Sequence, residues 1–194
     1  MKRWTVFSLV VVFILGMSGC GGSGSVNLNP EATKATIKAV PKWYNNPVDY
    51  IPEGSIGERA TETSRDMMIA DEKAQNAARG ALRLQIEDIG ETGNTRFVKE
   101  TGLDRDSEIV KRFEGGNVSA SASVLRNTRV IKSETHVEQG GIYRAYVLMT
   151  APDPELELFR QLERDKELME KFEQTEYFNG LSERIEKYKE RQGK

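Results

Sequence analysis

One long apolar run opens the chain, and shorter periodic segments follow it. Residues 4–15 are almost entirely apolar, with Lys2 and Arg3 before them and small residues after them. This order of charge, apolar run and small residues predicts a secretory signal peptide over residues 1–19. A membrane-spanning helix is the weaker interpretation, because the run is shorter than the roughly 18 to 20 residues that a span requires.

The strongest helical periodicity lies between residues 64 and 89. Apolar residues recur there three or four positions apart, which places them on one face of a helix, and the alanines among them allow close packing on a sheet. Ser64 is the expected N-cap, and Gly90 and Gly93 are expected to end the helix. The predicted buried face consists of Met67, Ala70, Ala74, Ala77, Ala81 and Leu84.

A second, weaker helix is predicted from about Asp104 onward. Gly115 and Gly116 cost about 1 kcal/mol each inside a helix, so we expect a break at this pair. Residues 118–125 then resume as helix, although the alternation of Ser and Ala over residues 119–123 also fits a strand.

Alternating polar and apolar positions predict two strands joined by a tight turn. Residues 129–138 alternate as in a half-exposed strand, and residues 142–150 are apolar on both faces, as in a central strand. Gly140 and Gly141 between them tolerate positive φ. Residues 55–57 fit either a short strand or a turn. In the first long strand Ile131, Ser133, Thr135 and Val137 share one predicted face, and Lys132, Glu134, His136 and Glu138 share the other.

Two prolines mark the end of the sheet region. Pro152 and Pro154 cannot donate to a strand ladder, so a boundary is expected there. Residues 155–175 read as one charged helix with an apolar side, and Leu181, Ile185 and Tyr188 continue that stripe. We interpret this part as a solvated helix that docks by one side or pairs with its own copy.

These elements predict an α+β fold. A small antiparallel or mixed sheet is packed by the Ala-rich helix and the weaker second helix, and a charged C-terminal helix follows. The expected organisation is a signal peptide over 1–19, a flexible linker over 20–39 that begins with Gly and Ser, an α/β domain over 40–151 and a charged helical tail over 152–194.

Charge argues against nucleic acid as a partner. The full chain has a formal charge of −2, and residues 1–19 contain two basic residues and no acid, so the chain without them is more acidic. Nucleic-acid binders instead show a clustered basic face.

Cys20 is the one cysteine of the chain and stands directly after the predicted signal peptide. An exported chain with one cysteine cannot form an internal disulfide, and a free exported thiol would be reactive. Lipidation of Cys20 is therefore favoured over a leftover thiol. Two or three acyl chains would make anchoring essentially permanent.

Family patterns strengthen this interpretation. Met17-Ser18-Gly19-Cys20 resembles the bacterial lipobox, with Met17 in place of the usual leucine. Residues 41–149 resemble the LPP20-like lipoprotein family through Pro41-Lys42-Trp43, the Ala-rich helix and the closing hairpin that ends in residues 143–149. The resemblance implies a lipid-anchored protein of the outer membrane that faces the periplasm, in some members linked to structures around flagellar motors, and it carries over no catalytic residue.

Catalytic and metal-binding patterns are not evident in the sequence. The one histidine, His136, falls on the polar face of a predicted strand, and no Cys or His cluster suggests a metal or cofactor. We therefore expect a non-enzymatic envelope lipoprotein that binds protein partners or itself through the C-terminal helix. The alternative is a peptidoglycan- or small-ligand-binding protein in which Trp43, Tyr44 and Tyr50 form a ring platform.

Overall fold

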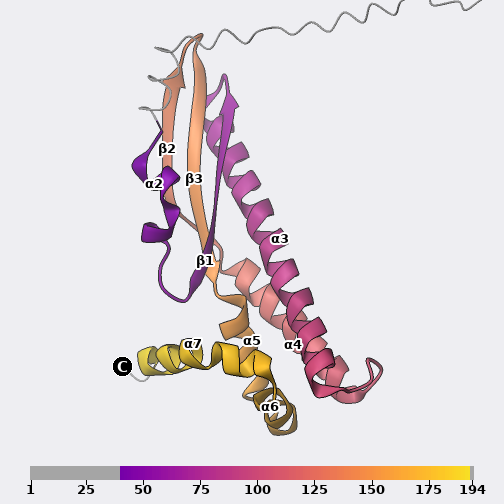
Figure 1. Ribbon diagram of the computed structural model, residues 1–194. Helices are drawn as coiled ribbons and strands as arrows, with labels where there is room; N and C mark the ends of the chain where they lie inside the picture. Colours follow the sequence, from indigo (N-terminus) through magenta and orange to yellow (C-terminus); the bar gives the residue numbers. More distant parts are fainter. Residues whose placement is uncertain (1–39, 193–194) are drawn as a thin grey trace, which may run out of the picture.

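The computed structural model describes residues 40–192, so the predicted signal peptide, Cys20 and linker lie outside the described residues. An antiparallel three-stranded sheet is covered by helix α3 on one face and continues at one end into a group of helices (Figure 1). The predicted α+β class is confirmed. In chain order the elements are α2 (Lys42–Asn45), η1 (Pro47–Tyr50), β1 (Ser55–Ser64), α3 (Met67–Thr101), α4 (Glu108–Arg126), β2 (Arg129–Glu138), β3 (Ile142–Pro152), α5 (Pro154–Leu162), α6 (Lys166–Glu173) and α7 (Glu176–Gln192).

The predicted hairpin and its central strand are confirmed. The strand order is β1-β3-β2, so β3 pairs on both sides. Gly140 and Gly141 in the connecting turn have φ values of 78° and 71°, a region that side chains with a Cβ rarely adopt. Strand β1 is longer than predicted and continues through Ser64, the residue expected to cap the following helix.

A register shift in β2 changes one predicted face. Val130 pairs with Met149 and Lys132 with Leu148, so Ile131 is the extra residue of a bulge. Ile131 consequently packs with Tyr146 and the other residues of the face opposite α3, rather than on the face of Ser133. The alternation predicted for the rest of the strand matches its pairing.

Helix α3 is much longer than predicted. Asp66, not Ser64, is its N-cap, and its carboxylate accepts hydrogen bonds from the N–H groups of Met68 and Ile69 at 2.8 and 3.1 Å. The helix passes through both glycines that were expected to end it and stops at Gly102, whose φ is 65°. An αL glycine at this position is the usual helix terminator.

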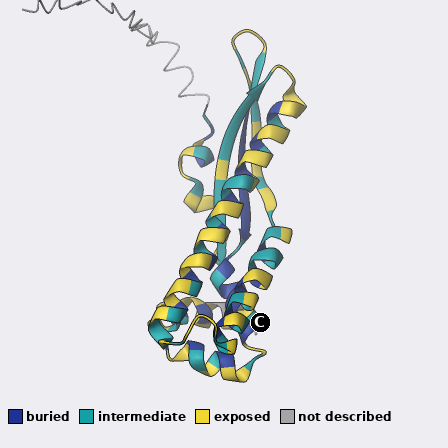
Figure 2. Ribbon diagram, turned by 90° about the vertical axis from the view of Figure 1, so that its right-hand side faces the viewer, coloured by how far each residue is buried: buried dark blue, intermediate teal, exposed yellow. Residues whose placement is uncertain are grey.

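The buried face of α3 also differs from the predicted one. Ala77 and Leu84 are exposed, because burial follows a spacing of four residues. Each such step turns about 40° around a helix of 3.6 residues per turn, so the buried side rotates from the sheet toward the neighbouring helices. The buried residues are Ala70, Ala74, Ala78, Leu82, Ile86, Gly90, Gly93 and Phe97. Figure 2 faces α3 and shows its outer side largely exposed.

Helix α4 is continuous, so the break predicted at Gly115 and Gly116 is wrong. A Cβ at Gly116 would lie 3.2 Å from Leu162 Cδ2, so this glycine lets α5 approach closely. Packing against α5 stabilises the helix and offsets the local cost of the glycine pair. The alternative strand over residues 119–123 is excluded by the same continuous helix.

The charged C-terminal part consists of three short helices rather than one. Asp153 and Asp165 cap α5 and α6, since their carboxylates accept hydrogen bonds from Leu156 N–H at 3.4 Å and Leu168 N–H at 3.2 Å. The boundary expected at residue 152 coincides with the passage from β3 to α5. Beyond it, apolar residues of α5, α6 and α7 share one buried core with Phe97 of α3 and Phe113 of α4.

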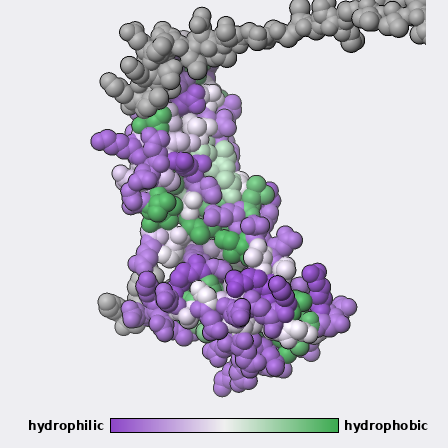
Figure 3. All heavy atoms as spheres, in the orientation of Figure 1, coloured by the Kyte–Doolittle hydropathy of each residue, from purple (hydrophilic) through white to green (hydrophobic). Residues whose placement is uncertain are grey.

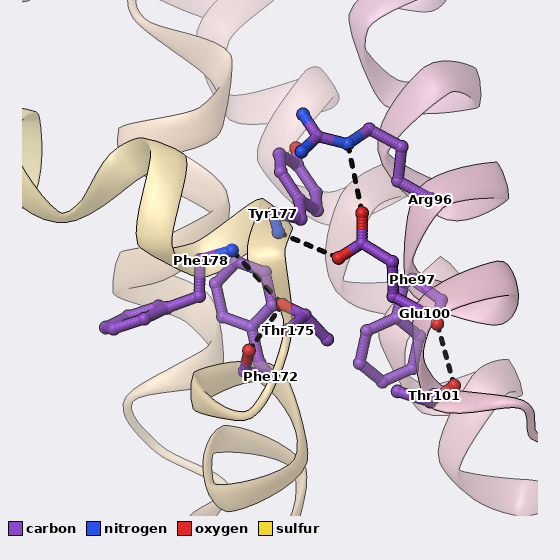
Figure 4. Close-up of polar contacts among 8 residues, drawn as sticks. All are labelled: Arg96, Phe97, Glu100, Thr101, Phe172, Thr175, Tyr177 and Phe178. Atoms are coloured by element: carbon purple, nitrogen blue, oxygen red, sulfur yellow. Dashed lines mark hydrogen bonds and ion pairs between the residues drawn. The ribbon is translucent and has the colours of Figure 1, made fainter.

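Polar and aromatic contacts hold α7 against α3 (Figure 4). Tyr177 N–H donates to Glu100 Oε2 at 2.8 Å, and the Arg96 guanidinium lies 4.6 Å from the centre of the Tyr177 ring. Phe97 and Phe113 stack nearby with ring centres 4.0 Å apart. The apolar stripe predicted to pair with a copy is therefore used inside the chain, at least for Leu181 and Ile185, which are buried.

Candidate functional site

The face of the sheet opposite α3 carries the first predicted aromatic residue, Trp43. Only 5 % of Trp43 is exposed, and it packs with Tyr146 and Leu148 of β3. Its indole N–H donates to the carboxylate of Glu134. Because both the ring and its polar atom are engaged, Trp43 fixes α2 on the sheet and leaves little surface for a ligand.

Tyr44, the second predicted ring, covers the middle of the same face. It meets Tyr146 edge to face, with ring centres 5.0 Å apart, and the Arg59 guanidinium lies 4.9 Å from its centre. A guanidinium over an aromatic ring is attracted to the electron-rich face. Tyr44 is thus held between β1 and β3, and only part of it remains accessible.

Tyr50 is the most exposed of the three predicted rings, at 42 %. Lys132 Nζ lies 5.3 Å from its centre. Trp43 and Tyr44 adjoin, with ring centres 5.9 Å apart, but no ring contact joins Tyr50 to either of them in the described part of the chain. The structure brings the rings of Trp43 and Tyr44 together and places Tyr50 apart from them, beside Lys132. The three rings therefore do not form one flat platform.

Charged side chains flank Tyr146 on this face. Arg144 Nε donates to Glu138 Oε1 at 2.5 Å, and this hydrogen bond raises the pKa of Arg144. Burial raises the pKa of Tyr146, so its phenol stays protonated at neutral pH.

Two buried polar atoms beside Tyr146 have no hydrogen-bond partner among the residues that the structure describes: Thr61 Oγ1 and His136 Nε2. His136 Nε2 lies 3.5 Å from Glu134 Oε2, and the imidazole meets Tyr146 edge to face at 5.7 Å. His136 is half-buried rather than exposed as expected from its strand position. These groups can hydrogen-bond a ligand, but their arrangement does not provide an activated nucleophile.

A polar groove of about 460 Å³ lies at the opposite end of the sheet from the hairpin turn. Arg126 and Arg129 line it, and no acidic residue does. Neither guanidinium has an ion-pair partner among residues 40–192. Hydroxyl and amide side chains complete the polar lining: Ser55, Asn127, Thr128 and Thr150.

The end of α4 shapes this groove. Asn127 Nδ2 donates to Ser123 O at 2.8 Å, and Thr128 Oγ1 donates to Leu125 O at 3.1 Å. These bonds satisfy carbonyls of the last helical turn, which otherwise present partial negative charge. An anion in the groove would thus meet two cationic residues and no acidic side chain. The groove was not predictable from the sequence, because its lining comes from β1, α4, β2 and β3.

Neither a search for metal-binding groups in the described residues nor comparison with known proteins assigns a function to this chain. No group of three or more His, Cys, Asp or Glu side chains suited to a metal ion occurs in the described chain. No helix in this same part is long and apolar enough to span a bilayer. Comparisons with protein-family models, curated proteins and solved structures found no match.

Proposed function

We propose that this chain is a lipid-anchored, non-enzymatic protein of the bacterial cell envelope, held at the periplasmic face of the outer membrane. The observation that carries this proposal is the position of Cys20. It is the one cysteine of the chain, and it follows an apolar run and the small residues Ser18 and Gly19. That order is typical of an exported chain that is cut before the cysteine and acylated on it.

The shape of the body suits a protein that makes contacts away from its anchor. Helix α3 contains 35 residues and is therefore about 52 Å long at 1.5 Å per residue. Its first half packs on the sheet, and its second half packs on α4 and α7. A rod of this length presents both sheet edges and the open sheet face to other envelope components, which we propose as the partners.

Hydrophobicity of the surface indicates which parts are suited to these contacts. On the side shown in Figure 3, hydrophobic residues gather across the middle of the body, and hydrophilic residues cover most of its lower end. Among residues 152–187 no large apolar side chain is strongly exposed. We therefore propose that partners meet the sheet half of the body, and that contacts of the C-terminal helices with a copy depend on charged surface.

Metabolic labelling with palmitate tests the anchor. The unchanged protein and a Ser23→Ala variant, which alters the predicted linker and keeps Cys20, are expected to incorporate label and to require detergent for extraction. A Cys20→Ala variant is expected to lose the label, because it lacks the thiol that is acylated. Absence of palmitate from the unchanged protein would contradict the proposal.

Ligand binding is the second candidate function, and the groove with Arg126 and Arg129 favours it. Two arginines without an ion-pair partner among residues 40–192, in a groove without an acidic side chain, suit a polar ligand with a carboxylate, such as a peptidoglycan fragment, better than the dispersed rings suit stacking. Calorimetric titration with carboxylate-bearing cell-wall fragments tests this. Binding should weaken in Arg126→Gln and Arg129→Gln and persist in Arg79→Gln, an exposed arginine on α3. No heat of binding at millimolar ligand removes this candidate.

A further inference from the structure

Four exposed apolar side chains gather at the end of the body that carries the hairpin turn. Met67, Met68 and Ile69 form the first turn of α3, and Val137 lies near the end of β2. These side chains, which we call the apolar tip, are 46 to 77 % exposed. Exposed apolar residues that cluster, unlike single ones, mark a surface that contacts something other than water.

Strand pairing explains why the four residues lie at the same end of the body. Ser64 at the end of β1 and Val137 of β2 both pair with Tyr143, from its two sides. Helix α3 begins just after Ser64, and Asp71 accepts a hydrogen bond from the Ser133 hydroxyl at 2.5 Å, which holds the start of the helix over β2. In Figure 1 both elements reach the upper end of the body.

From this geometry we propose that the apolar tip enters the surface of the same lipid bilayer that holds the acylated Cys20. The inference rests on the proposed lipid anchor. It adds an orientation, because it places the hairpin end of the body at the membrane and the groove with Arg126 and Arg129 at the far end.

The backbone of the tip is prepared for apolar surroundings. Unpaired N–H groups at the start of a helix are costly to move out of water. In α3 the Asp66 carboxylate accepts from Met68 and Ile69, and the Asp66 carbonyl accepts from Ala70 N–H at 3.0 Å. The helix therefore presents apolar side chains at this end while these N–H groups are already bonded.

The size and charge of the tip favour lipid over a protein partner. A stable protein interface buries about 800 Å² on each side, which four side chains at a narrow end do not supply. The exposed charges nearby are mixed, with Arg65 and Lys73 beside Asp66 and Glu72. Apolar insertion rather than attraction to one sign of charge is therefore the expected mode of contact.

Because the chain is held at the membrane by the proposed anchor at Cys20, a small apolar contact is sufficient to keep the tip in the bilayer. Val40, the first described residue, packs against the cluster of Trp43 and Tyr146, and the chain from there runs away from the tip to Ser55. The roughly 20 residues from Cys20 to Val40 reach at most about 70 Å when extended. Anchoring within that distance raises the effective concentration of the tip at the bilayer, so weak insertion is enough.

Site-specific fluorescence in vesicles tests the orientation. Acylation leaves no free thiol at Cys20, so a Met68→Cys substitution in the full chain supplies a single site for an environment-sensitive dye. Leu84→Cys is the matched control, because Leu84 is also apolar, 61 % exposed and on α3. The purified acylated protein is placed in phosphatidylethanolamine and phosphatidylcholine vesicles, with brominated acyl chains as the bilayer quencher and iodide as the aqueous quencher.

We expect the dye at position 68 to emit at shorter wavelength and to be quenched by brominated lipid, with little change on adding salt. The dye at position 84 should be quenched by iodide alone. Equal iodide quenching at both positions overturns the proposal, as does a dye at position 68 that is shielded from iodide but untouched by brominated lipid, which points to a protein partner. Two dyes per chain would instead mean that Cys20 is free, which refutes the lipid anchor itself.

Discussion

Gly93 lies where α3 packs against Tyr177 of α7, and its replacement by alanine tests how the C-terminal helices are held. A Cβ at position 93 would stand 2.8 Å from the Tyr177 hydroxyl oxygen and 3.2 Å from Cε1 of the same ring. The ring has little freedom to retreat. Arg96 lies over one face, and Phe172 meets the ring edge to face at 5.5 Å between centres.

Two effects of opposite sign set the expected magnitude for Gly93→Ala. Replacing glycine by alanine inside a helix stabilises by about 1 kcal/mol. Overpacking a buried contact costs about 1 to 3 kcal/mol. The net result is a loss of up to about 2 kcal/mol in unfolding free energy. For a chain of this size each kcal/mol shifts Tm by about 2 to 4 °C, so we expect a Tm lower by a few degrees.

Thermal unfolding followed by circular dichroism measures the effect, with Gly115→Ala as the matched control. Gly115 is also inside a helix, but a Cβ there would have no atom within 4 Å, so this variant should gain about 0.5 to 1 kcal/mol. Adding Tyr177→Phe to Gly93→Ala removes the closest contact and should recover part of the loss. A Gly93→Ala variant as stable as Gly115→Ala would refute the proposed close packing of α3 on α7.

Three further predictions concern other buried groups. Asn117→Ala should lower the unfolding free energy by about 1 to 3 kcal/mol, because the Asn117 amide donates to the buried Gly90 carbonyl oxygen at 3.1 Å; a loss below about 0.5 kcal/mol in urea denaturation contradicts this. Burial raises the pKa of Tyr177 above its ordinary value of 10.0, so the folded state favours the neutral phenol. The contribution of this phenol to the free energy of unfolding is complete below pH 10 and is lost at higher pH. Urea midpoints at about pH 8 and pH 10.5 should fall less in Tyr177→Phe than in the unchanged chain, and an equal fall argues against this assignment. Trp43→Ala should cost about 3 to 5 kcal/mol and Tyr50→Ala less than about 0.5 kcal/mol, and similar losses would show that the rings have similar roles.

The hairpin was predictable because its signals are local. Alternation over residues 129–138 and the pair Gly140-Gly141 determine strand and turn without reference to distant residues. The bulge at Ile131 was not predictable, because the alternation in the sequence continues through it and only pairing with β3 reveals the extra residue.

Glycines in the helices show where local reasoning fails. Gly93 and Gly116 carry a local cost that predicts a helix end, yet each is next to a side chain from much later in the chain, Tyr177 and Leu162. Tertiary packing outweighs a cost of about 1 kcal/mol, and the sequence does not show which distant residue packs there.

The candidate sites show the same difference between local signals, which the sequence reveals, and contacts with distant residues, which it does not. Trp43 and Tyr44 are close in sequence and adjacent in space, but burial of Trp43 depends on Glu134 and β3. Met67, expected in the core, is exposed because burial on α3 begins at Ala70. The groove combines residues from four separate elements, so no single stretch of sequence indicated it.

Lipid anchoring at Cys20 is tested most directly by the intact mass of the protein extracted from membranes of its native host. We predict a chain that begins at Cys20 and carries the added mass of two or three acyl chains, with both features lost in Cys20→Ala. An unmodified chain with a free Cys20 thiol would contradict the lipid anchor and, with it, the proposed place of this protein in the cell envelope.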